Sequence, residues 1–183
     1  DNDRMPLFWS GTPLIHYGFN LEASWKNFDI YALLQGAGMY TVQFSEVYAE
    51  VLWSKGANTP AYFYDRWRKE DPYNPNSKWV AGKWPATRLI QDTGAMYKES
   101  NIWRRDASYL RLKTLELGYT LPDSILRKSG ISNIRFYING YNLLTFCDSF
   151  VKAFDPEKVE GSYSAGMNYP LTKSFNIGFT ANF

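Results

Sequence analysis

The sequence has 183 residues, a formal net charge of +2, 45% hydrophobic residues and 18% aromatic residues. Because the charge is nearly balanced and no arginine-rich run is present, nucleic acid is not an expected partner. The longest uninterrupted apolar run, residues 30–34, is far shorter than the roughly 18 residues that a membrane-spanning helix needs. Any membrane span in this chain must therefore be made by strands.

Two strands joined by a tight turn are predicted near the start of the chain. In residues 17–25 every second side chain is apolar and the residues between are small or polar, and residues 28–38 show a similar alternation. Period-two alternation is typical of a strand with one apolar and one polar face. Only Lys26 and Asn27 separate the two segments, so the sequence predicts a β-hairpin with these residues at its tip.

A long connection follows, over residues 39–107. Residues 44–53 place apolar side chains at helical spacing, which predicts a short amphipathic helix. Residues 61–84 then combine many aromatic residues with proline and asparagine, a mixture too polar to form a strand. Exposed aromatic rings stack on sugar faces and anchor protein interfaces, but they also pack on one another inside loops. These alternatives stay open from the residues alone.

Three further strands are predicted, over residues 108–122, 133–146 and 174–183. In the first of them, Leu110 and Leu112 lie in one phase of the alternation, whereas Leu115 lies in the other. A β-bulge near Thr114 would reconcile the two phases. The connection over 121–132 is expected to hold one helical turn that begins at Pro122 and ends at Gly130.

The connections between these strands alternate strictly between short and long. The short ones cover residues 26–27 and 121–132, and the long ones cover 39–107 and 147–173. An up-and-down membrane barrel has tight turns at one rim and long loops at the other, so this alternation predicts strands of an all-β, antiparallel transmembrane β-barrel with the C-terminus on the short-turn side. About five strands cannot close a large barrel, so the chain is expected to be part of a larger one.

The phase of the last strands assigns one set of side chains to lipid. The residues expected to face lipid are Phe136, Phe175, Ile177 and Phe179. A secreted carbohydrate-binding β-sandwich is the alternative, because it would also alternate apolar and polar residues.

The chemistry of the chain does not predict an enzyme. His16 is the only histidine, and no carboxylate pair stands at a catalytic spacing, so no catalytic residue, metal site or cofactor is expected. Asp155 and Glu157 are possible Ca²⁺ ligands, as are Asp71 and its asparagine neighbours, but turn formation explains such residues more simply. Cys147 is the single cysteine and is expected to be a structural thiol.

Several motifs together resemble a known family. They are "DASYLRLKTLELGYTLP", "NIRFYINGYNLLTF", "DPE" at 155–157 and "YPLTKSFNIGFTANF", in this order. Their combination is similar to the C-terminal signature of SusC/RagA-type TonB-dependent outer-membrane transporters, and the resemblance covers nearly all of the chain. It implies that residues 1–183 are the C-terminal portion of a barrel of about 22 strands, whose plug domain and earlier strands lie outside this chain.

The resemblance also implies a function. Such a transporter sits in the outer membrane with its C-terminus in the periplasm, imports glycans or peptides, works with a SusD-like surface lipoprotein and is energised through TonB. A non-transporting adhesin barrel is the other alternative. In a transporter of this family, the aromatic segment 61–84 would supply contacts to the ligand or to the lipoprotein lid. The candidate contact residues are Trp67, Tyr73, Trp79 and Trp84. Phe179 and Phe183 would belong to the C-terminal signal for barrel assembly.

Overall fold

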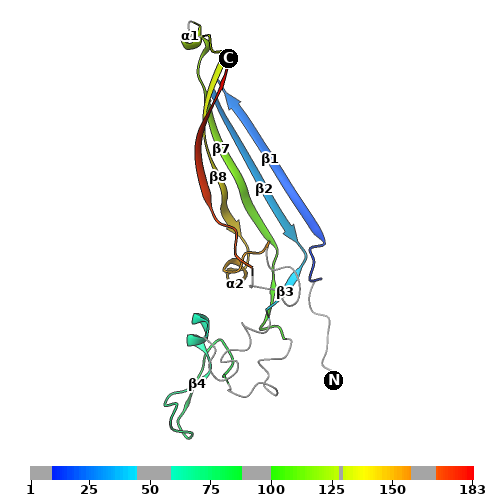
Figure 1. Ribbon diagram of the computed structural model, residues 1–183. Coiled ribbons are helices and arrows are strands. Elements are labelled where there is room, and N and C mark those ends of the chain that lie inside the picture. The colour runs from blue at the N-terminus through cyan, green and yellow to red at the C-terminus, as the bar shows by residue number, and fades with distance from the viewer. Residues whose placement is uncertain (1–9, 45–58, 88–99, 128–129, 158–167) are drawn as a thin grey trace.

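The computed structural model describes residues 10–44, 59–87, 100–127, 130–157 and 168–183. One antiparallel sheet of five strands dominates it, in the order β1-β2-β7-β8-β9 (Figure 1). The strands are β1 (Ile15–Trp25), β2 (Phe28–Gly38), β7 (Tyr109–Thr120), β8 (Asn133–Phe146) and β9 (Ser174–Asn182). The five predicted strands are thus confirmed, with small differences at their ends.

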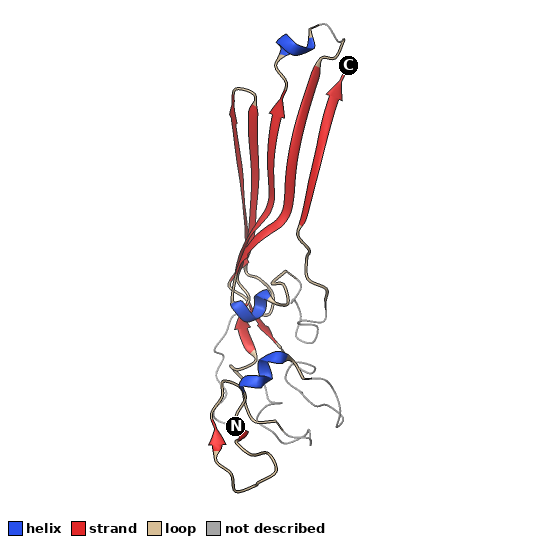
Figure 2. Ribbon diagram, turned by 90° about the vertical axis from the view of Figure 1, so that its left-hand side faces the viewer, coloured by secondary structure: helices blue, strands red, loops and turns tan. Residues whose placement is uncertain are grey.

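The short connections lie at one end of the sheet and the long ones at the other. Lys26 adopts a positive φ of 55° in the two-residue turn between β1 and β2, and Asn27 donates a hydrogen bond to the Thr120 carbonyl oxygen at 2.8 Å. The short helix α1 (Asp123–Leu126) and the C-terminus lie at this same end (Figures 1 and 2). The helix begins after Pro122 as expected, but it ends well before Gly130.

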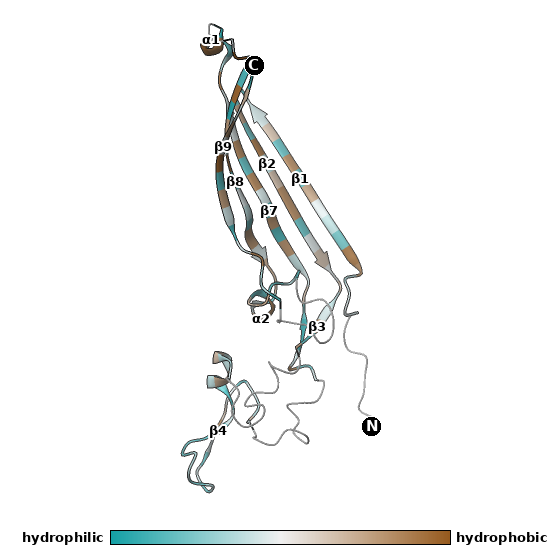
Figure 3. Ribbon diagram, in the orientation of Figure 1, coloured by the Kyte–Doolittle hydropathy of each residue, from teal (hydrophilic) through white to brown (hydrophobic). Residues whose placement is uncertain are grey.

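The two faces of the sheet differ in polarity. Hydrophilic and hydrophobic residues alternate along each long strand (Figure 3). Residues paired across strands share a face, and two rows of the apolar face are Ile30, Leu117, Ile138, Ile177 and Phe28, Tyr119, Phe136, Phe179. In the described part of the chain no second sheet covers this face, and most of its large side chains are exposed. A β-sandwich would bury such a face.

A bulge in β7 keeps the apolar face continuous. Leu112 pairs with Leu34, but Thr114 pairs with Leu33, so Lys113 is an extra residue relative to β2. The register of β7 with β8 shifts at the same place. The predicted bulge is therefore confirmed, and it allows residues on either side of it to keep their apolar side chains on one face.

The loops contain short strands that the sequence did not predict. β3 (Thr41–Gln43) pairs with β6 (Arg104–Asp106), and β4 (Arg68–Lys69) pairs with β5 (Trp79–Val80). The expectation that 61–84 contains no strand is therefore wrong. Two-residue strands carry no periodicity, and turn geometry and tertiary contacts form them instead.

The helices of the described residues are all short. A 3₁₀ segment, η3 (Ala61–Asp65), lies in the long loop, and α2 (Ser149–Lys152) follows β8. Asp148 begins α2 by accepting hydrogen bonds from two backbone N–H groups of its first turn. The helix predicted over 44–53 lies almost wholly outside the described residues. No helix in the described ranges has the length and apolar character required to cross a membrane.

Gly36 is a point of close packing between backbone and side chain within the long strands. The Tyr17 ring lies across it, and the Tyr17 hydroxyl donates to the Tyr109 carbonyl oxygen at 2.6 Å. A Cβ at Gly36 would lie 2.3 Å from that same oxygen. Gly36→Ala is therefore expected to destabilise the full-length protein by about 1–3 kcal/mol. The free energy of unfolding in detergent measures this.

Gly18→Ala is the matched control for this change. A Cβ at Gly18 would meet only the Leu34 carbonyl oxygen, at 3.6 Å, which is an ordinary contact. The control is expected to unfold like the wild type. Equal effects of the two variants would show that the contact across Gly36 is not what limits substitution.

Candidate functional site

A network of charged and amide side chains lines the polar face near the short-turn end. Arg135 of β8 pairs with Asp29 of β2, and its Nη2 donates to Glu116 Oε1 of β7 at 2.8 Å. Asn139 donates to Glu116 Oε2 at 3.1 Å and accepts from Asn176 of β9 at 2.9 Å. The network crosses four strands without a break, so this face is built to be hydrated or to meet another polar surface.

Glycines let the larger side chains of this network lie against the sheet. A Cβ at Gly118 would fall 2.3 Å from Arg135 Nη2, and one at Gly178 would fall 2.6 Å from the Tyr137 ring. Both side chains thus occupy the space above a neighbouring strand's glycine. The Arg135 guanidinium also lies over the Tyr137 ring, 5.5 Å from its centroid. The Arg135 and Tyr137 side chains consequently lie flat along the sheet instead of extending away from it.

At the other end of the sheet, two loops pack together through a buried aromatic cluster, here called the rim cluster. Trp84 and Trp103 stack with ring centroids 5.3 Å apart, and Phe44 meets Phe150 edge-on at 4.9 Å. The other rings of the rim cluster are Tyr40, Tyr62, Phe63, Phe154 and Tyr109, the last at the start of β7. Because its members come from both the 39–108 connection and the 147–173 connection, the rim cluster fixes these loops to each other.

The rim cluster also engages a cation and the cysteine. The Arg105 guanidinium lies over the rings of Trp84 and Phe150, 5.9 and 5.5 Å from their centroids. Cys147 packs against the edge of the cluster, and its partial burial raises the pKa of its thiol. A protonated thiol among aromatic rings fits the structural role expected for it.

A hairpin made of β4 and β5 stands out from the rim cluster. Asp71 accepts a hydrogen bond from the Tyr73 N–H at 2.9 Å, and the Ser77 hydroxyl donates to the Asp71 carbonyl oxygen at 3.0 Å. Lys69 donates to the Ser77 carbonyl oxygen at 2.8 Å and lies over the Trp79 ring. These bonds order the turn, as the sequence reasoning expected of Asp71.

The four aromatic candidates of this loop separate into two environments. Trp84 is 4% exposed inside the rim cluster, so its ring is not available for contact in this fold. Trp67, Tyr73 and Trp79 are 46, 94 and 55% exposed on the hairpin. Internal packing, one of the alternatives left open, therefore describes Trp84, whereas the other three remain candidates for contact.

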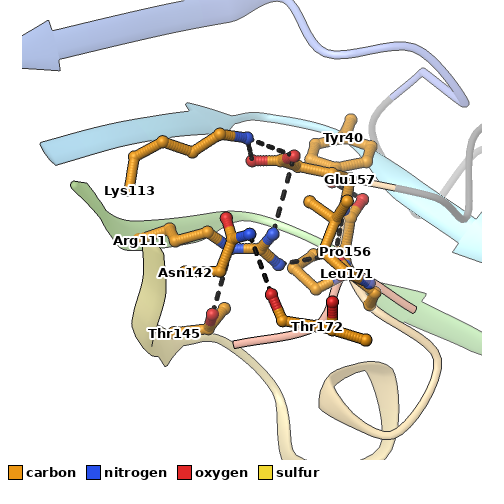
Figure 4. A network of polar contacts seen from close by, with 10 residues as sticks. Tyr40, Arg111, Lys113, Asn142, Thr145, Pro156, Glu157, Leu171 and Thr172 are labelled. Atoms are coloured by element: carbon orange, nitrogen blue, oxygen red, sulfur yellow. Dashed lines mark hydrogen bonds and ion pairs between the residues drawn. The ribbon is translucent and has the colours of Figure 1, made fainter. Parts of the chain in front are cut away.

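Where the 147–173 connection meets the polar face, four charges form what is here called the ion-pair ladder (Figure 4). Arg111, 2% exposed, donates to Asp155 Oδ1 at 2.5 Å, and Lys113 donates to both oxygens of Glu157 at 3.0 and 2.8 Å. Arg111 also donates to the Thr145 hydroxyl at 3.0 Å. Sequence reasoning considered Asp155 and Glu157 only as ligands or turn formers and missed these partners.

The remaining residues singled out from the sequence lie on the apolar face, beyond the last strand or in turns. Phe136, Phe175, Ile177 and Phe179 share the exposed apolar face, and Phe183 is 92% exposed beyond β9. Among the described residues, no group of three or more histidine, cysteine, aspartate and glutamate side chains could hold a metal ion. The carboxylates considered as Ca²⁺ ligands instead bind cations of this chain or cap turns.

Comparison with curated proteins gives two significant relatives in Formosa agariphila. TonB-dependent receptor P3 is 32% identical over 183 residues, which cover 94% of this chain and 16% of the receptor. TonB-dependent receptor P26 is 29% identical over 195 residues, which cover 99% of this chain and 18% of that receptor. The chain therefore spans less than a fifth of either relative. No protein-family model matches the chain.

Solved structures of similar fold include the RagAB peptide importer in its open-open state. It matches with a TM-score of 0.67 and 27% identity, over 94% of this chain and 17% of the other chain. A structure of the RagAB peptide transporter matches with a TM-score of 0.66 and 26% identity, over 93% of this chain and 17% of the other. The five-stranded sheet and its loops thus correspond to a segment of a β-barrel transporter.

Proposed function

Because this chain belongs to the SusC/RagA-type TonB-dependent transporters, we propose that the protein of which it forms a segment imports a nutrient across the outer membrane. The nutrient is a glycan or an oligopeptide. A SusD-like surface lipoprotein covers the barrel mouth, and TonB drives uptake through the plug, which lies outside this chain. The observation that carries the proposal is the likeness of sequence and fold to such transporters over nearly the whole chain.

The two faces of the sheet support this function. Outer-membrane lipid covers the apolar face, including Phe136, Phe175, Ile177 and Phe179, and the polar network of the other face lines the solvated lumen. The end with short turns, α1 and the C-terminus is periplasmic, since short turns belong to that rim. Phe179 and Phe183 remain the predicted assembly signal, with the exposed edge of β9 as the template for strand addition.

The opposite end supports a role in capture rather than in chemistry. The relatives are receptors and transporters, and we infer no enzymatic activity. RagAB is a peptide importer, which supports an oligopeptide ligand. The exposed rings of Trp67 and Trp79 would also stack on sugar faces, which supports a glycan.

Uptake by the full-length transporter in its native outer membrane tests the proposal. Cells that carry or lack the transporter gene are given fluorescent oligopeptides or fluorescent oligosaccharides, with and without an uncoupler that removes the proton gradient. We expect uptake of one class to require both the gene and the gradient. Gene-independent uptake of both classes would refute import, and uptake unaffected by the uncoupler would refute the role of TonB.

The hairpin carries the proposed contact with the lid or the ligand. Trp67→Ala and Trp79→Ala remove exposed rings from an ordered hairpin, and neither ring belongs to the rim cluster. Truncating a contact residue of this kind typically weakens an interface by about five- to thirtyfold. We therefore expect each variant to reach the surface in normal amount but to bind the lipoprotein, or the ligand, more weakly. Titration of the purified partner measures this.

Tyr169→Ala is the matched control for the hairpin variants. Tyr169 is also a large exposed ring, at 83%, but it lies on the other long connection. Normal affinity in this variant would assign the effect to the hairpin. Wild-type affinity in both tryptophan variants would leave the hairpin without a contact role.

A further inference from the structure

Two cations of β7, Arg111 and Lys113, point to the same side of the sheet, because alternate residues of a strand share a face. The register shift of β7 lies between Leu112 and Thr114, so Lys113 is the bulged residue itself. Their partners, Asp155 and Glu157, are also two residues apart, in the segment that follows α2. The ion-pair ladder thus joins a strand to a turn, with an additional pair between Arg111 and Glu157 at 3.5 Å. It connects the β8–β9 loop to the polar wall of the barrel.

The second limb of the same loop is fastened at the same place. Asp155 uses its Oδ2 to accept the Leu171 N–H at 2.7 Å, while its Oδ1 also accepts the Glu157 N–H at 3.0 Å. Asn142, at a positive φ of 55° in the β8 side of the bulge, donates to the Thr172 carbonyl oxygen at 3.1 Å. One carboxylate therefore joins the outgoing limb, the returning limb and the wall.

The arrangement does not resemble a ligand site. The side chains of Arg111 and Asp155 are both buried, and their charges neutralise each other. Pro156 between the two carboxylates is fully buried, and its carbonyl oxygen accepts the Tyr40 hydroxyl at 2.7 Å. A buried ion pair contributes little net stability compared with apolar packing, but breaking it by removing one partner is costly. Such a pair is suited to holding one geometry.

We propose that the ion-pair ladder is a permanent lock, which keeps the base of the β8–β9 loop on the lumen wall at every stage of import, with Asp155 as the positioning residue. The statement that the loop base stays in place during import rests on the proposed transport function, whereas the attachment of the loop to the wall does not. The base of this loop is then a static part of the barrel mouth, and any movement that admits the ligand takes place in other elements.

The first experiment tests the lock without any ligand. Full-length transporter carrying Asp155→Asn is compared with wild type by the rate at which an added protease cleaves the 147–173 loop on intact cells. Asparagine removes the charge that Arg111 requires, so cleavage is expected to rise about 100-fold or more, since proteolysis follows the population of the opened state. Asp148→Asn is the matched control, because Asp148 is exposed and asparagine also caps helices.

Equal cleavage of wild type, Asp155→Asn and Asp148→Asn would overturn the lock. Should Asp155→Asn fail to reach the cell surface, Glu157→Gln takes its place, because it weakens the pair with Lys113 and the longer pair with Arg111 but leaves the Arg111–Asp155 pair intact. A smaller increase in cleavage is then expected, and no increase would count against the proposal in the same way.

The second experiment tests permanence. Lys113→Cys and Glu157→Cys are combined in a Cys147→Ser background and joined by a short bismaleimide, so that the base of the loop cannot leave the wall. Uptake of fluorescent oligopeptides and of fluorescent oligosaccharides is measured with and without the cross-link. A permanent lock predicts the same uptake in both states, and loss of uptake on cross-linking would show that the loop base must move.

Failure of the lock and failure of the proposed function are distinguishable. If wild-type cells import neither probe, the transport proposal is wrong for those ligand classes. The proteolysis experiment still decides whether Asp155 holds the loop, because it needs no ligand.

Discussion

Replacing Ile177 by arginine is expected to destabilise the folded barrel by about 2–4 kcal/mol, the cost of a cation on the lipid face near the membrane midplane. Ile177 lies in the middle of β9, 87% exposed on the apolar face, directly opposite Ile138 of β8. An arginine there would have to desolvate its guanidinium or bend it toward a distant headgroup. The free energy of unfolding of the full-length protein in lipid measures the loss.

The neighbouring residue is the control that makes this measurement informative. Asn176 points to the polar face, where it donates to Asn139 at 2.9 Å. Asn176→Arg loses one exposed hydrogen bond but keeps its cation hydrated, so its cost should be much smaller. Equal costs at the two positions would mean that the faces of the sheet have been assigned wrongly.

Trp103→Ala is expected to have the largest effect outside the membrane. Trp103 is 2% exposed and stacks on Trp84 in the rim cluster, and truncating a buried tryptophan typically costs about 3–5 kcal/mol. The loss should stay local, because the rim cluster joins loops to one another and the long strands have their own pairing. Hydrogen exchange of loop and strand amides in the full-length protein separates the two regions.

Trp79→Ala is the matched control for this prediction. It removes the same type of side chain from the same long connection, but from a ring that is 55% exposed. We expect its loop amides to exchange at the wild-type rate. If Trp79→Ala loosened the loops as much as Trp103→Ala, the rim cluster would not be the element that holds them together.

The long strands could be predicted because one face requires apolar side chains and the other requires small or polar ones. One face is apolar and the other polar over nine or more residues in each strand, so alternation marks their extent. The phase change between Leu112 and Thr114 even located the bulge. The short β3, β4, β5 and β6 have no such pattern, because contacts within the loops hold them in place.

The candidate site was harder to predict because its contacts join residues far apart in the sequence. The sequence around Trp79 and Trp84 does not show which of them is buried. The fold exposes Trp79 and buries Trp84. Arg111 and Asp155 are 44 residues apart, and no spacing rule links a strand cation to a loop carboxylate. Their neighbourhood depends on the path of the β8–β9 loop, which a single sequence does not specify.

The β3–β6 pairing bears on how such a protein can change during evolution. Thr41 pairs with Asp106 just beyond the point where Ala37 pairs with Tyr109, so the chain leaves and re-enters the large sheet through a two-stranded stem. Loop-closure entropy grows only with the logarithm of length, and doubling the segment above the stem would cost about 0.6 kcal/mol. Insertions, deletions or a wholesale exchange above Gln43 and Arg104 would therefore leave the strand register intact. A lineage could acquire new ligand preferences by replacing the segment between Gln43 and Arg104, while the strands of the large sheet are inherited unchanged.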